Sequence, residues 1–83
     1  MKIEITADRR VLQGTPVQIV QAMRELVFND DVRALSVGEY IDWAAERAAE
    51  MTGTQLAVSG ETDDARAASL IESMLASGLA RRR

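Results

Sequence analysis

Residues 2–18, KIEITADRRVLQGTPVQ, decide the fold expected of this chain, because they contain both a strand pattern and a clear helix start. Within this stretch, Ile3 and Ile5 alternate with polar side chains, the period of two that is typical of a strand with one buried face. Residues 10–13 form a second short candidate strand. With a turn between them, the two stretches predict an N-terminal β-hairpin.

The end of the same stretch marks the beginning of the first helix. Thr15 is expected as its N-cap, Pro16 as its first residue, and Gln18 as the partner that completes a capping box. Val17 and Phe28 lie about 20° apart on a helical wheel and away from the main apolar stripe. They therefore predict a second apolar contact of this helix. The stripe itself spans about 120°, as expected for a face that packs on the core: Pro16, Ile19, Val20, Met23, Leu26 and Val27.

Two further helices follow from the same kind of signal. Ser36 with Glu39 is another capping box, and this second helix is expected to run to about Thr52. Thr62 caps a third helix, which ends before Gly78. The apolar residues of both helices recur at the spacing of an amphipathic helix, so each is expected to bury one face.

The expected fold class is therefore α+β, with an N-terminal β-hairpin packed on three α-helices. Residues 55–59 are a candidate for a short third strand of this sheet. We expect residues 1–83 to form a single small domain, with a basic C-terminal tail at 81–83. A domain of this size buries only about 60% of the surface of its unfolded chain, so contacts with a partner are a common source of added stability.

The composition excludes several classes of chemistry. The chain has no Cys and no His, hence no thiolate nucleophile, no imidazole base and no zinc site built from these residues. It also lacks a G-x-S-x-G turn and a glycine-rich phosphate loop. The carboxylates of Glu61, Asp63 and Asp64 could bind Ca²⁺ or Mg²⁺, but acidic residues are ordinary at a helix start. We therefore expect a protein that is not an enzyme and has no catalytic residue, cofactor or metal.

The charge balance bears on the partner and the location. Residues 1–80 carry seven positive and thirteen negative charges, a net charge of −6, and the last three residues are all Arg. Because nucleic-acid affinity rests mainly on Lys and Arg at phosphates, this balance argues against nucleic acid as a partner. No stretch approaches the roughly 18 apolar residues of a membrane span, and no signal peptide is visible. We expect a cytoplasmic protein with no membrane contact.

Trp43 is the first candidate for a partner-binding residue. It lies about 100° from the Ala-rich face of the second helix, among charged neighbours. A large aromatic side chain at such a position is typical of an interface anchor. The alternative, left open by the sequence, is that Trp43 covers the core and Arg47 stacks on its ring. The candidate partner-binding residues are the following: Trp43, Arg47, Glu39, Glu50, Val17 and Phe28.

Two functions from different classes follow. The first is a non-enzymatic protein-protein interaction or assembly module, which binds a protein partner or self-associates as a homo-oligomer such as a homodimer. The second comes from residues 36–44, SVGEYIDWA, which resemble the start of the second helix of ribbon-helix-helix repressors.

That resemblance implies a DNA-binding transcriptional regulator whose N-terminal strand enters the major groove. Its base-reading side chains would be Lys2, Glu4 and Thr6. The carboxylate of Glu4 departs from the family's pattern, and so do the eight residues 7–14 between strand and helix. A third interpretation, an acidic body that binds a basic protein partner or mimics nucleic acid, rests on net charge alone.

Overall fold

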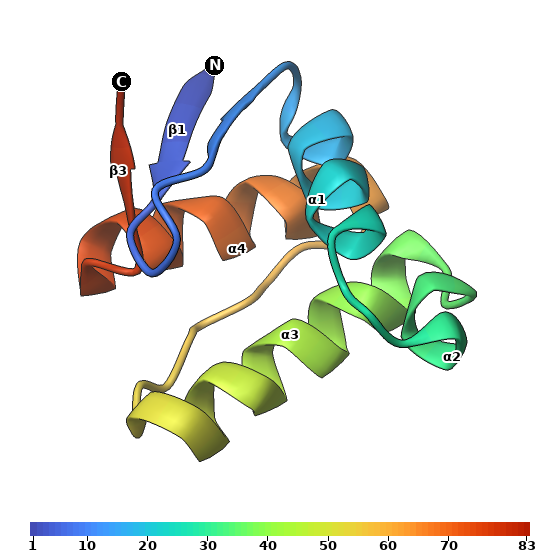
Figure 1. Ribbon diagram of the computed structural model, residues 1–83. Helices are drawn as coiled ribbons and strands as arrows, with labels where there is room; N and C mark the ends of the chain where they lie inside the picture. Colours follow the sequence, from blue (N-terminus) through green and yellow to red (C-terminus); the bar gives the residue numbers. More distant parts are fainter.

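Both ends of the chain contribute strands to one antiparallel sheet. The computed structural model describes residues 1–83 and places β1 (Lys2–Ile5) between β2 (Val11–Gln13) and β3 (Ala80–Arg82). In this register Glu4 of β1 lies opposite Val11 on one side and Arg81 on the other. The two termini therefore lie side by side at one end of the molecule (Figure 1). The N-terminal hairpin and the α+β class are both confirmed.

The third strand does not lie where the sequence analysis placed its candidate. Residues 55–59 belong to the connection between two helices, and their backbone bonds to side chains rather than to a strand. The carbonyl oxygen of Ala57, for example, accepts hydrogen bonds from the hydroxyls of Ser69 (3.2 Å) and Ser73 (2.5 Å). The stretch expected as a basic tail pairs with β1 instead. The amide of Thr6 donates to the carbonyl oxygen of Leu79 (3.0 Å) and extends this pairing.

The three expected helices are present with their expected caps. They are α1 (Pro16–Glu25), α3 (Val37–Thr52) and α4 (Asp63–Ser77), and their N-cap hydroxyls belong to Thr15, Ser36 and Thr62. Each hydroxyl accepts a hydrogen bond from the amide three residues later, which satisfies a backbone donor that the helix itself cannot. None of the helices is long and apolar enough to cross a membrane.

A short additional helix changes the end of α1. The side chain of Asn29 accepts hydrogen bonds from the amides of Asp31 and Val32, so Asn29 caps α2 (Asp30–Arg33). As a result α1 ends at Glu25, and Phe28 lies in the bend between the two helices. The wheel argument that joined Phe28 to Val17 is therefore wrong, because it extended α1 by a turn that does not exist.

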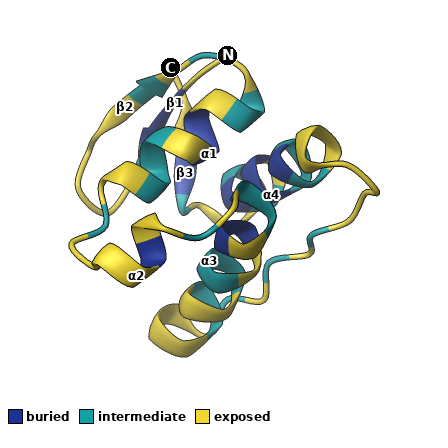
Figure 2. Ribbon diagram, turned by 90° about the vertical axis from the view of Figure 1, so that its right-hand side faces the viewer, coloured by how far each residue is buried: buried dark blue, intermediate teal, exposed yellow.

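The core lies between the inner face of the sheet and the three long helices. Ile3 of β1 is fully buried, as the alternation of β1 predicted, and buried side chains concentrate where the helices face each other and the sheet (Figure 2). On the outer face of the sheet Lys2 and Arg81 are exposed, whereas Glu4 is buried. The core cluster contains eleven residues: Ile3, Ile19, Val20, Val32, Tyr40, Ile41, Ala67, Leu70, Ile71, Met74 and Ala80.

Candidate binding surface

The bend between α1 and α2 exposes the side chain of Phe28 completely (103%). Hydrogen bonds fix the backbone before and after Phe28. The amide of Val27 donates to the carbonyl oxygen of Arg24, and Asn29 caps α2. Burying a Phe side chain contributes about 1.5–3 kcal/mol relative to leaving it in water. Because its ring stays in water, Phe28 adds none of this free energy to folding. A partner that covered the ring would gain it as binding free energy.

An apolar pocket of about 170 Å³ lies beside this bend. It forms where the β1–β2 turn meets the end of α1 and the first turns of α3, and its lining is hydrophobic except for Asp8. Leu26 is one wall of the pocket and lies two residues from Phe28. Since two residues of extended chain span at most about 7 Å, the backbone that bears the exposed ring lies within about 7 Å of the backbone of a pocket residue. The pocket is lined by five residues: Ile5, Asp8, Met23, Leu26 and Tyr40.

Tyr40 links the pocket to the core. Its side chain is buried, and this burial raises the pKa of the Tyr40 hydroxyl to about 12, so the group is neutral in any physiological buffer. The ring of Trp43 lies beside that of Tyr40, with the two ring centroids 5.7 Å apart. Trp43 is half-buried and packs against the core cluster, so only part of its surface is open to a partner.

The other residues proposed from the sequence lie in different environments. The carboxylate of Glu39 accepts the amide of Ser36 (3.0 Å), which lowers the pKa of Glu39 and commits it to capping α3. Arg47 and Glu50 are exposed further along α3. Val17 lies in the first turn of α1 and packs against the core. The structure thus leaves Phe28 as the fully exposed apolar side chain of the set.

The pocket could not be read from the sequence. Its residues come from a turn, the end of one helix and the start of another, and each had an ordinary local role as core or loop. Only the packing of these three elements brings the residues together. The nearest sequence signal was the apolar run 26–28, which the analysis assigned to α1.

The residues that the ribbon-helix-helix resemblance singled out lie on the central strand and in the turn that follows it. Lys2 and Thr6 are exposed, but Glu4 between them is buried and pairs with Arg81 of β3 and with Arg83, which follows β3. A base-reading role for these three side chains stays a prediction.

Acidic side chains do not gather into a metal site. Asp63 and Asp64 occupy the first turn of α4, and no three Asp or Glu side chains come close enough together to hold a metal ion. Comparison with protein-family models, with curated proteins and with solved structures finds no match for this chain. Any function is therefore to be inferred from its own residues and contacts.

Proposed function

We propose that the protein is a non-catalytic protein-protein interaction module that self-associates through the surface around Phe28. The observation that carries this proposal is a fully exposed Phe28 ring two residues along the chain from Leu26, which lines an apolar pocket. One chain thus offers both halves of a complementary contact. A second copy related by a two-fold axis would place each Phe28 ring at the other copy's pocket.

The dimensions of the pocket agree with this contact. An apolar cavity of about 150 Å³ accommodates a benzene molecule, and this pocket measures about 170 Å³. The hydrophobic walls suit a phenyl ring, and Leu26 is itself partly exposed, so the dimer would cover it as well. Because the contact is made twice, burial of both rings contributes about 3–6 kcal/mol to dimerisation.

The test is the oligomeric state of the wild type and of Phe28→Ser, measured by sedimentation velocity over a series of concentrations. We expect a wild-type dimer and a dissociation constant raised at least about hundredfold in Phe28→Ser, since each 1.4 kcal/mol is tenfold. The matched control is Met51→Ser, because Met51 is also exposed (69%) but lies at the far end of α3. Met51→Ser should dimerise like the wild type.

A pocket variant makes the test independent of Phe28. Leu26→Gln changes the wall and should also weaken the dimer, while circular dichroism confirms that each variant is folded. The proposal is overturned by a wild type that stays monomeric at every concentration. It is equally overturned if Phe28→Ser dimerises as tightly as the wild type.

A further inference from the structure

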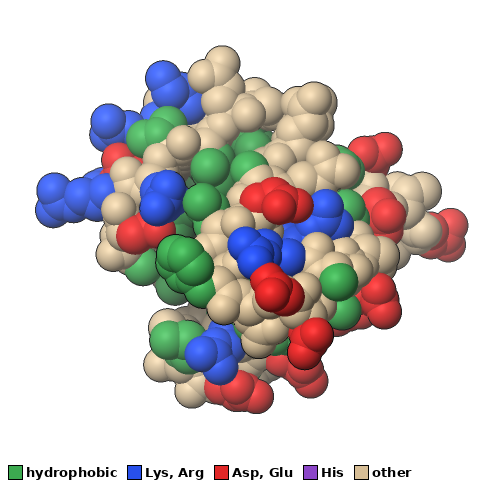
Figure 3. Space-filling model, turned by 45° about the vertical axis from the view of Figure 1, so that its right-hand side comes forward, with side chains coloured by type: hydrophobic (Ala, Val, Ile, Leu, Met, Phe, Trp, Pro, Cys, Tyr) green, Lys and Arg blue, Asp and Glu red, His purple; other side chains and the backbone are tan.

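The charges of this chain are divided between two poles. The sheet and its turn, residues 1–13 and 80–83, contain six of the ten basic residues and two of the thirteen acidic ones, a net charge of +4. Residues 14–79 carry the remaining four basic and eleven acidic residues, a net charge of −7. In Figure 3 most Asp and Glu side chains lie toward the right and lower edge, whereas Lys and Arg side chains lie on the left and upper left and also near the centre. The sheet is therefore positively charged although the whole chain has a net charge of −3.

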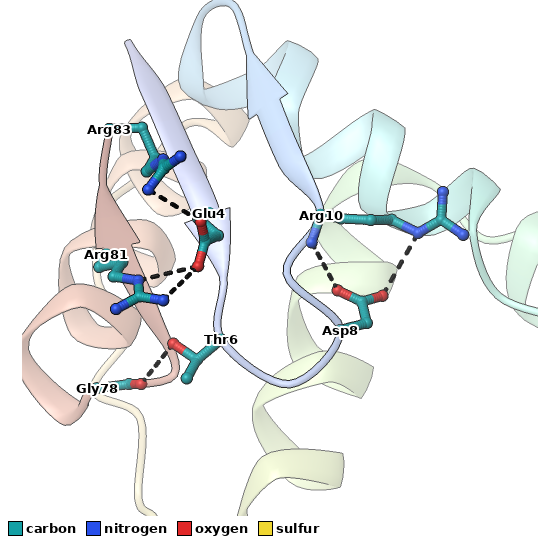
Figure 4. A network of polar contacts seen from close by, with 7 residues as sticks. All are labelled: Glu4, Thr6, Asp8, Arg10, Gly78, Arg81 and Arg83. Atoms are coloured by element: carbon teal, nitrogen blue, oxygen red, sulfur yellow. Dashed lines mark hydrogen bonds and ion pairs between the residues drawn. The ribbon is translucent and has the colours of Figure 1, made fainter.

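Two arginines of the C-terminal segment meet at one carboxylate on the outer face of the sheet. Arg81 donates to Glu4 Oε2 through Nε (2.9 Å) and Nη2 (2.6 Å), and Arg83 Nη1 lies 3.3 Å from Glu4 Oε1 (Figure 4). The bonds from Arg81 lower the pKa of Glu4, so its carboxylate stays charged. Glu4 thereby holds two guanidinium groups side by side that would otherwise repel each other.

These guanidinium groups keep the capacity to bind a second anion. A guanidinium group has five N–H donors, and Glu4 takes two from Arg81. The side chains of Arg81 and Arg83 are 60% and 52% exposed, so their free donors face solvent. Lys2 is exposed on the same face, and Arg9 lies in the adjoining turn. The face thus combines fixed guanidinium groups with further positive charge around them.

We propose that this outer face of the sheet binds the phosphate backbone of a nucleic acid, with Arg81, Arg83 and Lys2 as the contacting residues and without recognition of bases. A duplex carries one negative charge per about 1.7 Å of its axis, a dense array that suits several cations on one small face. Arginine is suited to phosphate in particular, because its planar donors match two phosphate oxygens at once.

The negative charge of residues 14–79 does not prevent the sheet from contacting phosphate groups. The molecule measures 28 Å along its longest axis, whereas charges in water are screened over about 8 Å at physiological ionic strength. The net charge of residues 1–80 speaks against a nucleic-acid partner only where charges are evenly spread. In the folded protein the basic residues of the sheet are separated from most of the acidic ones.

The test is fluorescence anisotropy of a labelled DNA duplex of mixed sequence, titrated with the protein at several salt concentrations. With Arg81, Arg83 and Lys2 as three phosphate contacts, we expect log K to fall against log salt with a slope of about −3. Arg81→Gln should weaken binding and reduce the steepness of that slope by about one. Glu4→Gln should tighten binding by about threefold or more, since it removes a carboxylate from the face.

Matched control variants distinguish binding by this face from an effect of the protein's net charge. Arg47→Gln and Glu50→Gln change the charge by the same amounts on α3 and should leave binding unchanged. If Glu4→Gln does not fold, as judged by circular dichroism, Arg83→Gln still tests the face, because it should weaken binding as Arg81→Gln does. The Phe28→Ser variant should keep the salt slope, so this test is independent of the dimer proposed above.

Several outcomes overturn the proposal. One is the absence of binding at the lowest salt concentration, and another is an equal response to the variants on the sheet face and to their controls on α3. Binding to phosphatidylglycerol vesicles without binding to DNA would assign the face to a membrane surface. Self-association without DNA that weakens as salt is added would show that the face binds the acidic residues of a second copy.

Discussion

Alkaline pH should destabilise this protein through a single side chain, Tyr40. Its burial raises the pKa of the hydroxyl to about 12 in the folded state, whereas the unfolded chain titrates near the ordinary value of 10. Above pH 10 the unfolded chain therefore loses this proton first, and the free energy of unfolding falls until the folded state also ionises near pH 12. A difference of two pKa units at about 1.36 kcal/mol each predicts a loss of about 2.7 kcal/mol.

The measurement is simple because the chain has one Tyr and one Trp. The ultraviolet absorbance of tyrosinate titrates Tyr40 directly in the folded protein. Urea unfolding followed by Trp43 fluorescence gives the stability at each pH, and with a slope near 1 kcal/mol per molar the midpoint should fall by about 2–3 M urea. The dimer proposed above couples stability to concentration, so the series is run at one protein concentration.

Tyr40→Phe is the control, since it removes the hydroxyl and keeps the ring. This variant should lose most of the alkaline fall in stability. The reasoning fails if Tyr40 of the folded protein titrates near pH 10. It also fails if Tyr40→Phe loses as much stability as the wild type over the same range.

Three backbone positions with positive φ allow further predictions. Arg9 has a φ of 59°, in the left-handed region that costs a residue with a side chain about 1–2 kcal/mol, so Arg9→Gly should raise the free energy of unfolding by up to about 1 kcal/mol while Arg9→Ala should not. Thermal unfolding of both variants decides this, and an equal gain in both would contradict it. Gly60→Ala should cost about 2 kcal/mol or more, because φ is 125° and the new Cβ would lie 2.7 Å from the Cβ of Ala65. Gly53→Ala, where φ is 71° and the space is open, should cost only about 1 kcal/mol, and urea unfolding that ranks the two the other way would refute the steric argument.

The sequence by itself determined where the long helices begin. The hydroxyls of Thr15, Ser36 and Thr62 cap them through contacts that reach only three residues along the chain, so the local sequence is sufficient. The alternation in β1 was readable for the same reason, since the period of two is a property of one strand. The lack of His and Cys likewise needs no structure, and it removes the same chemistry from any fold of this chain.

Tertiary structure decided which residues far apart in the sequence contact each other. Arg81 and Glu4 lie 77 positions apart, and only the pairing of β3 with β1 turns a presumed tail into part of a basic face. Phe28 became a surface residue because Asn29 caps α2, and its neighbouring pocket exists because a turn and two helices converge. Composition counts charges and apolar groups correctly, but the packing of the elements sets which of them meet and which face solvent.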